Sequence, residues 1–390
     1  MSTTVIDTAV IGAGAAGLMV AAHLAERGVD FELYDEHARV GDAWRERYRS
    51  LRLFTPRPFL SLPGLPIEIG RFRYPTGAQL ADYLERYAMH FRLPVHQITV
   101  EAVMAVPSAV TGRPASTRSM RPTWTTPARA RSFSELRTSI TPCPAFWALT
   151  ARPFSVSIVV LRRRRMKMAV MRLPRGRSMS IRQLHSLDYR GAEQLADGPV
   201  LVVGAANSGP DVALEAAAAG HAVTLAGRHP GHVPIDIDRP LGNLMTAIFI
   251  RRLRNTTIDT EKGRAARAEG AGHGVMLVRN SLKDLARAGV VQVGRIEGVE
   301  AGRPVTADGT AIDAATVVWC TGSRPELHWI DVDGVVDVHG LPIEVRGVAS
   351  GCRGLGFVGM PFQYSVASET LMGMDRDVTG GRCGAPSGLR

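Results

Sequence analysis

The sequence lacks an apolar run that could cross a membrane, because no stretch of about eighteen consecutive apolar residues occurs in it. Its start also lacks the basic segment and following apolar segment of a secretory signal. Cysteine is scarce: Cys143, Cys320, Cys352 and Cys383 lie more than thirty residues apart and form no CxxC pair. These absences predict a cytoplasmic protein without membrane contact or a bound metal.

Acidic residues are nearly absent from one part of the chain. Residues 102–180 hold fourteen Arg and one Lys against the single acid Glu135, a net charge of +14. The whole chain of 390 residues carries +11, which leaves −3 for the remainder. The same block holds only two of the 40 Gly but eight of the 24 Pro. A nucleic-acid surface is normally spread over a fold, so we expect no specific nucleic-acid partner.

Glycine is abundant where an apolar, strand-like run meets a helical pattern near the N-terminus. Gly12, Gly14 and Gly17 stand there in the spacing GxGxxG. The first permits a tight turn, the second lets a pyrophosphate approach the backbone, and the third lets the helix pack on the strand. A second strand at 31–34 leads to Asp35, an acid that can accept hydrogen bonds from a ribose. This stretch predicts a dinucleotide-binding βαβ unit.

The pattern returns in the second half of the chain. Gly204, Ala206 and Gly209 follow another apolar run, with Ala in place of the middle glycine and Ser208 beside the last one. The next strand ends in Ala-Gly-Arg, so Arg228 occupies the place of the acid. An arginine there accommodates the 2′-phosphate of NADPH, which an acid would repel. The alternative is a solvated surface arginine.

Two such units in one chain, the first with an acid and the second with an arginine, predict bound FAD and the coenzyme NADPH. A flavoprotein of this layout can reduce disulfides or oxygenate substrates. Disulfide reduction needs a close cysteine pair beside the flavin, and the sequence has none. We therefore expect a monooxygenase.

Several longer stretches resemble the flavin-containing monooxygenases, especially their bacterial flavoprotein oxidoreductase branch. The stretches are VGDAWRERYRSLRLFTPRPFLSLPGLP from Val40, YPTGAQLADYLERYAMHFRLPV from Tyr74, LHSLDYRGAEQL from Leu184, VVWCTGSRP from Val317 and RGLGFVGMPFQYSVASETLMGMDRD from Arg353. Together they cover roughly residues 5–100 and 181–378.

The resemblance implies a reaction and further binding residues. NADPH would reduce FAD, O₂ would add at flavin C4a, and the hydroperoxide would oxygenate a small organic substrate. Trp44 would belong to the FAD site, and Thr321 and Gly322 would lie where the NADPH and flavin domains join. Three positions depart from the family pattern: Asp42 replaces a usual second glycine, and Met179 and Ile181 replace the Phe and Gly that normally precede His185. The role of His185 can be structural or catalytic, and no catalytic residue is assigned.

The expected fold is α/β, with two nested Rossmann-like domains in which the NADPH domain is inserted into a discontinuous FAD domain. No pattern indicates an oligomeric state or a substrate. The expected divisions are 1–101 for the first part of the FAD domain, 102–180 for the atypical Arg/Pro/Ser-rich segment, 195–319 for the NADPH domain, 320–378 for the second part of the FAD domain and 379–390 for an atypical tail.

The basic block interrupts the resemblance. Residues 102–178 lack a helix or strand period and the strand ending in Ala-Thr-Gly that the family has there. The tail after about residue 378 likewise lacks the expected terminal helix. We interpret both as out-of-frame reading of a GC-rich gene; a divergent insertion and a functional nucleic-acid- or membrane-binding arm are the alternatives. A chain without a core strand would be a defective, non-catalytic remnant of the family, which is the alternative to an active enzyme.

This interpretation makes a prediction about the gene. Another frame of the nucleotides that encode residues 102–178 should encode a strand ending in Ala-Thr-Gly, a Pro-containing loop and Phe-x-Gly before His185. Sequencing the gene and translating all frames tests this. Frames without family-like sequence would instead support a real insertion.

Overall fold

The computed structural model describes most of the chain outside the basic block. The described residues are 8–97, 181–322 and 329–379 with gaps at 56, 71–73, 233–239, 270–276 and 353, together with 325, 327 and the backbone of short strands at 3–4, 103–104, 124–125 and 157–161. The tail from residue 380 and most of the block 102–180 therefore lie outside the described residues, as do the frame interpretations that concern them.

The larger sheet, which is the first in chain order, has seven strands, of which five neighbouring ones are parallel. Two short antiparallel strands extend one edge. The order across the sheet is β16 (Glu344–Val345), β17 (Val348–Ala349), β18 (Leu355–Val358), β7 (Ser157–Leu161), β2 (Thr8–Ile11), β3 (Phe31–Asp35) and β4 (Val95–Gln97). The order changes direction beside β2, where open α/β sheets bind ligands at the carboxyl ends of their strands.

The position of β7 corrects one expectation. The sequence of residues 102–178 predicts no core strand, but β7 lies between β2 and β18 and is parallel to both. The run Ile158-Val159-Val160-Leu161 is apolar and largely β-branched, which suits a strand in the middle of a parallel sheet. The composition of the surrounding block obscured this short run. The described first sheet is therefore complete across its centre.

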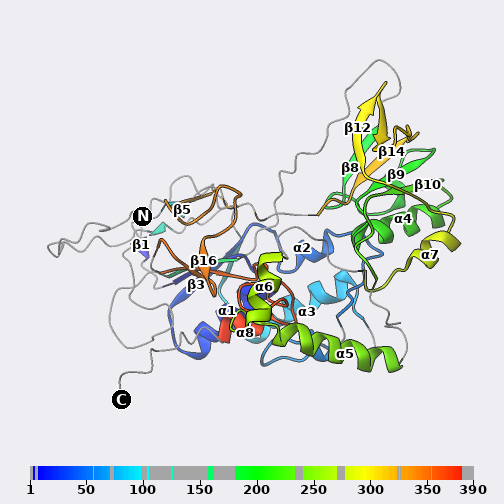
Figure 1. The fold of residues 1–390 in the computed structure, drawn as a ribbon. Coiled ribbons are helices and arrows are strands. Elements are labelled where there is room, and N and C mark those ends of the chain that lie inside the picture. Colours follow the sequence, from blue (N-terminus) through cyan, green and yellow to red (C-terminus); the bar gives the residue numbers. More distant parts are fainter. Residues whose placement is uncertain are drawn as a thin grey trace.

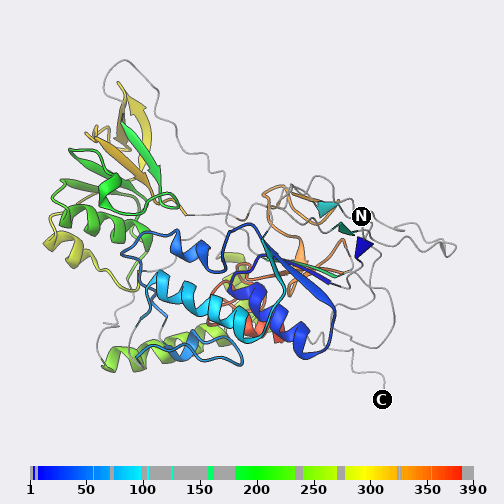
Figure 2. The same ribbon diagram turned by 180° about the vertical axis from the view of Figure 1, so that it is seen from behind.

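Helices cover the larger sheet and tie its parts together. Helix α1 (Ala15–Glu26) contacts β2, β3, α3 (Gly77–His90) and α8 (Met374–Thr379), so three distant segments meet around it. Figure 2 shows α1 and α3 side by side on this face. Helix α3 begins with a capping box in which Thr76 and Gln79 satisfy each other's backbone amides. The buried side chains of α1 and α3 fill the largest hydrophobic core.

The second sheet has five parallel strands and forms a separate unit, at the upper right in Figure 1. Its order is β11 (Val291–Val293), β10 (Val223–Ala226), β9 (Val200–Val203), β14 (Thr316–Trp319) and β8 (Arg182–His185). Helices α4 (Ser208–Ala218) and α7 (Leu282–Arg287) contact each other, and α4 packs on β9 and β10. Both sheets thus confirm the expected α/β class with two Rossmann-like units. Strand β8 joins the second sheet although it precedes residue 195.

The remaining elements are short or lie at the surface. They are α2 (Asp42–Arg45), α5 (Pro240–Asn255), α6 (Glu261–Glu269), the 3-10 turns η1 (Arg57–Phe59) and η3 (Ala192–Gln194), the hairpin of β12 (Ile296–Glu300) and β13 (Arg303–Thr306), and the pairs β1 (Thr3–Thr4) with β6 (Trp124–Thr125) and β5 (Val103–Met104) with β15 (Ile330–Asp331).

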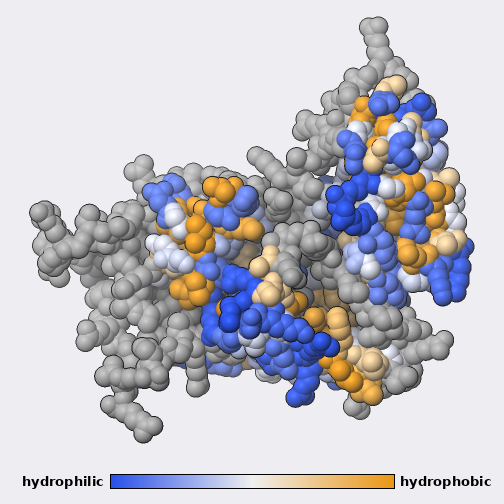
Figure 3. Space-filling model, viewed as in Figure 1, coloured by the Kyte–Doolittle hydropathy of each residue, from blue (hydrophilic) through white to orange (hydrophobic). Residues whose placement is uncertain are grey.

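Hydrophobic residues gather on the surface along α5, as Figure 3 shows. Leu244, Met245 and Ile248 are exposed, whereas Thr246 and Ile250 on the opposite side are buried. Helix α5 is therefore anchored by one face and adds an apolar strip to the surface with the other. Among the described helices, none combines the length and the apolar character that a membrane crossing requires.

Candidate functional site

A pocket of about 910 Å³ lies at the carboxyl edge of the first sheet. The five residues that the sequence analysis assigns to an FAD site all line it: Gly12, Gly14, Gly17, Asp35 and Trp44. Its other walls come from segments 53–55, 185–190 and 369–374 and from Trp329. The pocket is thus built from parts of the chain that are far apart in sequence.

The first glycine turn leaves space where a phosphate would have to lie. Gly12 has φ +102°, a left-handed conformation that favours glycine, and its amide donates to the Tyr34 carbonyl at 2.6 Å. Gly14 has an extended backbone, and no protein atom lies within 4 Å of where its Cβ would stand. No side chain caps the start of α1, and its first turn contains no acid. The first amides of α1 can therefore bind an anion.

Asp35 is held in place by three hydrogen bonds. Its carboxylate accepts from the Ala13 amide at 2.5 Å and from both the amide and the ring of His37 at 2.8 Å. Burial disfavours the charged carboxylate, but the bonds from His37 and Ala13 outweigh it and lower the pKa of Asp35. The bond to Asp35 raises the pKa of His37. An ionised carboxylate at the end of β3 can accept the two hydroxyls of a ribose.

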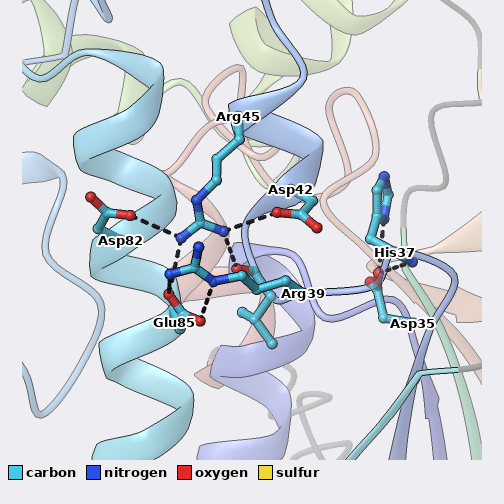
Figure 4. Close-up of polar contacts among 8 residues, drawn as sticks. Asp35, His37, Arg39, Asp42, Arg45, Asp82 and Glu85 are labelled. Carbon is cyan, nitrogen blue, oxygen red and sulfur yellow. Dashed lines mark hydrogen bonds and ion pairs between the residues drawn. The ribbon is translucent and has the colours of Figure 1, made fainter.

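A cluster of charged groups fixes the segment between Asp35 and Trp44 (Figure 4). Arg45 donates to Asp42 at 3.1 Å, to Asp82 at 2.9 Å and to Glu85 at 3.0 Å. Arg39 binds the same Glu85 with two bonds of 2.5 Å. Because Asp82 and Glu85 lie on α3, the cluster anchors this side of the pocket to a helix of the core.

The same cluster explains why residue 42 is an aspartate and not the second glycine of the family pattern. Gly41 has φ +91°, and a Cβ there would lie 2.6 Å from the Ala81 carbonyl oxygen, so glycine is required. Asp42, in contrast, occupies the first turn of α2, where an acid is favoured by the helix dipole and accepts from Arg45. The second glycine of the family pattern is thus replaced without strain.

His185 lies in the pocket wall, which the sequence alone did not reveal. It ends β8 of the second sheet, and its Nδ1 accepts a hydrogen bond of 3.2 Å from the Leu187 amide. The neutral ring therefore carries its proton on Nε2, and burial lowers the pKa of His185, which favours that neutral form. Nε2 is buried, and no described residue accepts from it. Arg190, Asp188 and Trp329 also line the pocket, and only the tertiary structure brings them there.

The second glycine turn is packed more tightly than the first. Gly204 has φ +113°, and a Cβ there would collide with the backbone of Cys320. A Cβ at Gly209 would collide with the carbonyl of Gly204, so this glycine lets α4 start directly beside the turn. Ala206 fits between them without needing a positive φ. Ser208 is the first residue of α4.

The other predicted NADPH residues follow the carboxyl ends of strands in the second sheet. Arg228 is exposed two residues after β10 and forms no ion pair with a described residue. Thr321 and Gly322 come shortly after β14, the neighbour of β9, and Gly322 has φ +88°. None of these residues lines the pocket at the first sheet. The structure therefore has two separate candidate binding edges, one on each sheet.

Comparisons with known proteins agree with this arrangement. The family described as "Pyridine nucleotide-disulphide oxidoreductase" matches residues 9–112. A protein of Geobacillus kaustophilus (strain HTA426), described as "Uncharacterized oxidoreductase CzcO-like", is 30% identical over 375 residues, which cover 96% of each chain.

The chain belongs to the CzcO-like oxidoreductases. Solved structures with the same fold include a flavin-containing monooxygenase and a steroid monooxygenase bound to NADP.

Solved structures show that the family fold serves more than one reaction. A flavin-containing monooxygenase from Stenotrophomonas maltophilia has a TM-score of 0.64 at 22% identity, with 96% of each chain covered. A bacillithiol disulfide reductase from Staphylococcus aureus has a TM-score of 0.56 at 14% identity, covering 96% of this chain and 95% of its own. The choice between the two reactions must therefore come from the residues of the site.

The residues at the first turn fit the adenosine and pyrophosphate part of FAD. The open space at Gly14 admits a pyrophosphate, the first amides of α1 can bind it, and Asp35 is ionised for the ribose.

Gly14→Val tests this assignment. The Gly14 backbone is extended and its Cβ would meet no protein atom, so valine should leave the fold stable while it blocks the pyrophosphate. We expect purified Gly14→Val to retain less than about a tenth of the wild-type flavin, since the clash occurs only with ligand. Flavin absorbance per mole of protein and the melting temperature are the measurements. Gly298→Val, another glycine with open space but in β12, is the matched control and should keep its flavin. Full flavin occupancy in Gly14→Val would place FAD elsewhere.

Proposed function

We propose that this chain is an FAD-dependent, NADPH-utilising monooxygenase that uses O₂ to oxygenate a small organic substrate in the cytoplasm. The observation that carries the proposal is the pocket itself. It joins the first glycine turn and Asp35 to His185, the last residue of the edge strand of the second sheet, and to Arg190, which follows that strand. A cofactor in this pocket would therefore lie against the unit that carries the second turn.

The first unit, which is built on the larger sheet, supports FAD as the resident cofactor. Gly12, Gly14 and the start of α1 would hold its pyrophosphate, and Asp35 its ribose. Trp44 and Phe54 line the same pocket and can cover an aromatic ring. Partly buried Trp44 also packs against the large core, so its position is set by the fold.

The second unit supports NADPH as the coenzyme. Gly204, Ser208 and Gly209 would place the start of α4 against its pyrophosphate. Arg228 has no competing ion pair with a described residue and can bind the 2′-phosphate with two hydrogen bonds. Thr321 and Gly322 would face the coenzyme from the neighbouring strand end.

The chemistry follows from what the pocket contains and what the sequence lacks. FAD supplies hydride acceptance and oxygen transfer when it is bound. The protein would orient the substrate and exclude water, and His185 would offer one neutral N–H donor. Disulfide reduction is disfavoured because no two cysteines are close in sequence, and the two described ones, Cys320 and Cys352, form no disulfide with each other.

Activity and flavin content together test the proposal. We expect the purified protein to be yellow and to consume NADPH and O₂ faster in the presence of an accepted sulfide, amine or ketone. Oxygenated product should appear in proportion to the NADPH consumed in excess of the background. A folded protein that binds neither flavin nor NADP⁺ would instead be the non-catalytic remnant.

Arg228→Ala tests the coenzyme assignment. Loss of a charge-assisted contact to the 2′-phosphate is worth about 1.5–3 kcal/mol, so the KM for NADPH should rise roughly ten- to a hundredfold. The KM for NADH, which lacks that phosphate, should change much less. Arg303→Ala removes an exposed arginine of the same unit that pairs with Asp313, and it should change neither KM. Equal effects of Arg228→Ala on both coenzymes would contradict the role.

A further inference from the structure

The outward face of helix α5 divides into an apolar half and a basic half. Its first half exposes Leu244, Met245 and Ile248, which we call the apolar strip. Arg251 and Arg252 are exposed and continue the same face one turn later, because residues three or four positions apart lie on one side of a helix. The outward face of α5 therefore changes from apolar to cationic along its length, and Figure 3 shows its apolar part at the surface.

The two arginines of this face are not used inside the described part of the protein. Neither Arg251 nor Arg252 forms an ion pair with a described residue. Arg254, which lies one turn after the buried Ile250, instead pairs with Asp375 at 2.9 Å. The arginine on the inward side of α5 is thus paired, and the two on the outward side are available to an anion outside the chain.

The inward face of α5 packs against the wall of the pocket. Phe249 belongs to a hydrophobic cluster with Phe54, and Ile250 belongs to another cluster that also contains Phe54. Phe54 itself lines the pocket. Because a helix with its side chains is about 10 Å across, the outward face of α5 lies one helix diameter from the pocket wall.

A second copy of this chain is a poor partner for the outward face. An antiparallel pair of α5 helices would set the apolar strip of one copy on the arginines of the other, and a parallel pair would set the arginines against each other. Three partly exposed side chains also supply only a fraction of the roughly 800 Å² per partner that a stable interface buries. A lipid surface needs no matching shape, and it takes apolar side chains at the acyl-chain boundary and cations at its phosphates.

We propose that the outward face of α5 docks the protein on an anionic membrane surface, with the apolar strip at the acyl-chain boundary and Arg251 and Arg252 at the headgroup phosphates. A helix that lies in the plane of a membrane needs no membrane-spanning run, so the composition of the chain permits this docking. The docked helix holds the Phe54 wall of the pocket beside the bilayer. The inference does not depend on the proposed reaction.

Oxidation of methionine by hydrogen peroxide shows which surface the membrane covers, because a covered thioether reacts more slowly. Met245 in the apolar strip and Met89 on α3 are both exposed, at 45% and 72%. Vesicles of equal parts phosphatidylglycerol and phosphatidylcholine are the probe. In the vesicle-bound protein, we expect Met245 to oxidise several-fold more slowly than in free protein and Met89 to oxidise at an unchanged rate. Mass spectrometry of the two peptides measures both rates.

Variants of α5 make the test specific. Residues 102–180 carry a net charge of +14 and attract the same vesicles in every variant, so the protection of Met245 decides and total binding does not. Leu244→Gln/Ile248→Gln removes most of the apolar strip and should abolish the protection. Arg251→Gln/Arg252→Gln should weaken it, because the headgroup contacts are lost. Val338→Gln replaces an apolar side chain that is 96% exposed outside α5, and it should leave the protection unchanged.

Three results would overturn the inference. Vesicle-bound protein in which Met245 is unprotected would be attached by another surface, the basic block above all. Equal protection of Met245 and Met89 would mean that the vesicle covers the protein without preference for α5. Protection of Met245 that rises with protein concentration in the absence of vesicles would make a second copy the occupant. Since docking requires neither flavin nor NADPH, failure of the proposed reaction would leave each of these results as it stands.

Discussion

Strand β7 is the element on which the first unit depends, because the backbone groups of a buried strand must find hydrogen-bond partners. β2 and β18 come from opposite ends of the chain and are both fully buried. β7 pairs with both of them in parallel and so makes one sheet of them. The pairing brings the segment after β18 to the start of α1, where Gly359 and Met374 complete the pocket. A site formed by the two ends of the chain thus depends on five residues within an otherwise atypical block.

The two glycine turns use the same residue type for different physical reasons. At the first turn, Gly14 faces open space, and its lack of a side chain matters to a ligand. At the second turn, Gly204 and Gly209 face backbone at very short distances, and their lack of side chains matters to the fold itself. Ala at position 206 is tolerated in this setting. Equivalent motif positions can therefore differ in whether a substitution affects binding or stability.

Polar contacts tie the chain along the rim of the pocket to helices α3 and α4. Arg45 and Arg39 join the α2 segment to Glu85 of α3, and Tyr48 and Ser50 join the segment that follows it to α4. Directional bonds of this kind specify one relative position of the two segments. Nonpolar contacts alone specify that position less sharply. The chain between Asp35 and Phe54 is consequently both a wall of the pocket and the link to the second unit.

The sequence by itself determined the fold class, the two turns with their following acid and arginine, and the family, because each depends on local spacing of glycine, apolar and charged residues. It did not determine the role of β7, since a strand of five residues within an arginine-rich block carries little local signal and acquires its place only by pairing with β2 and β18. It left the role of His185 undecided, because the place of this residue in the pocket wall depends on β8 lying at the edge of the second sheet. Only the tertiary structure placed Tyr48 against Asp211, 163 residues away. Contacts across such separations depend on how whole elements pack, and no periodicity within a segment encodes them.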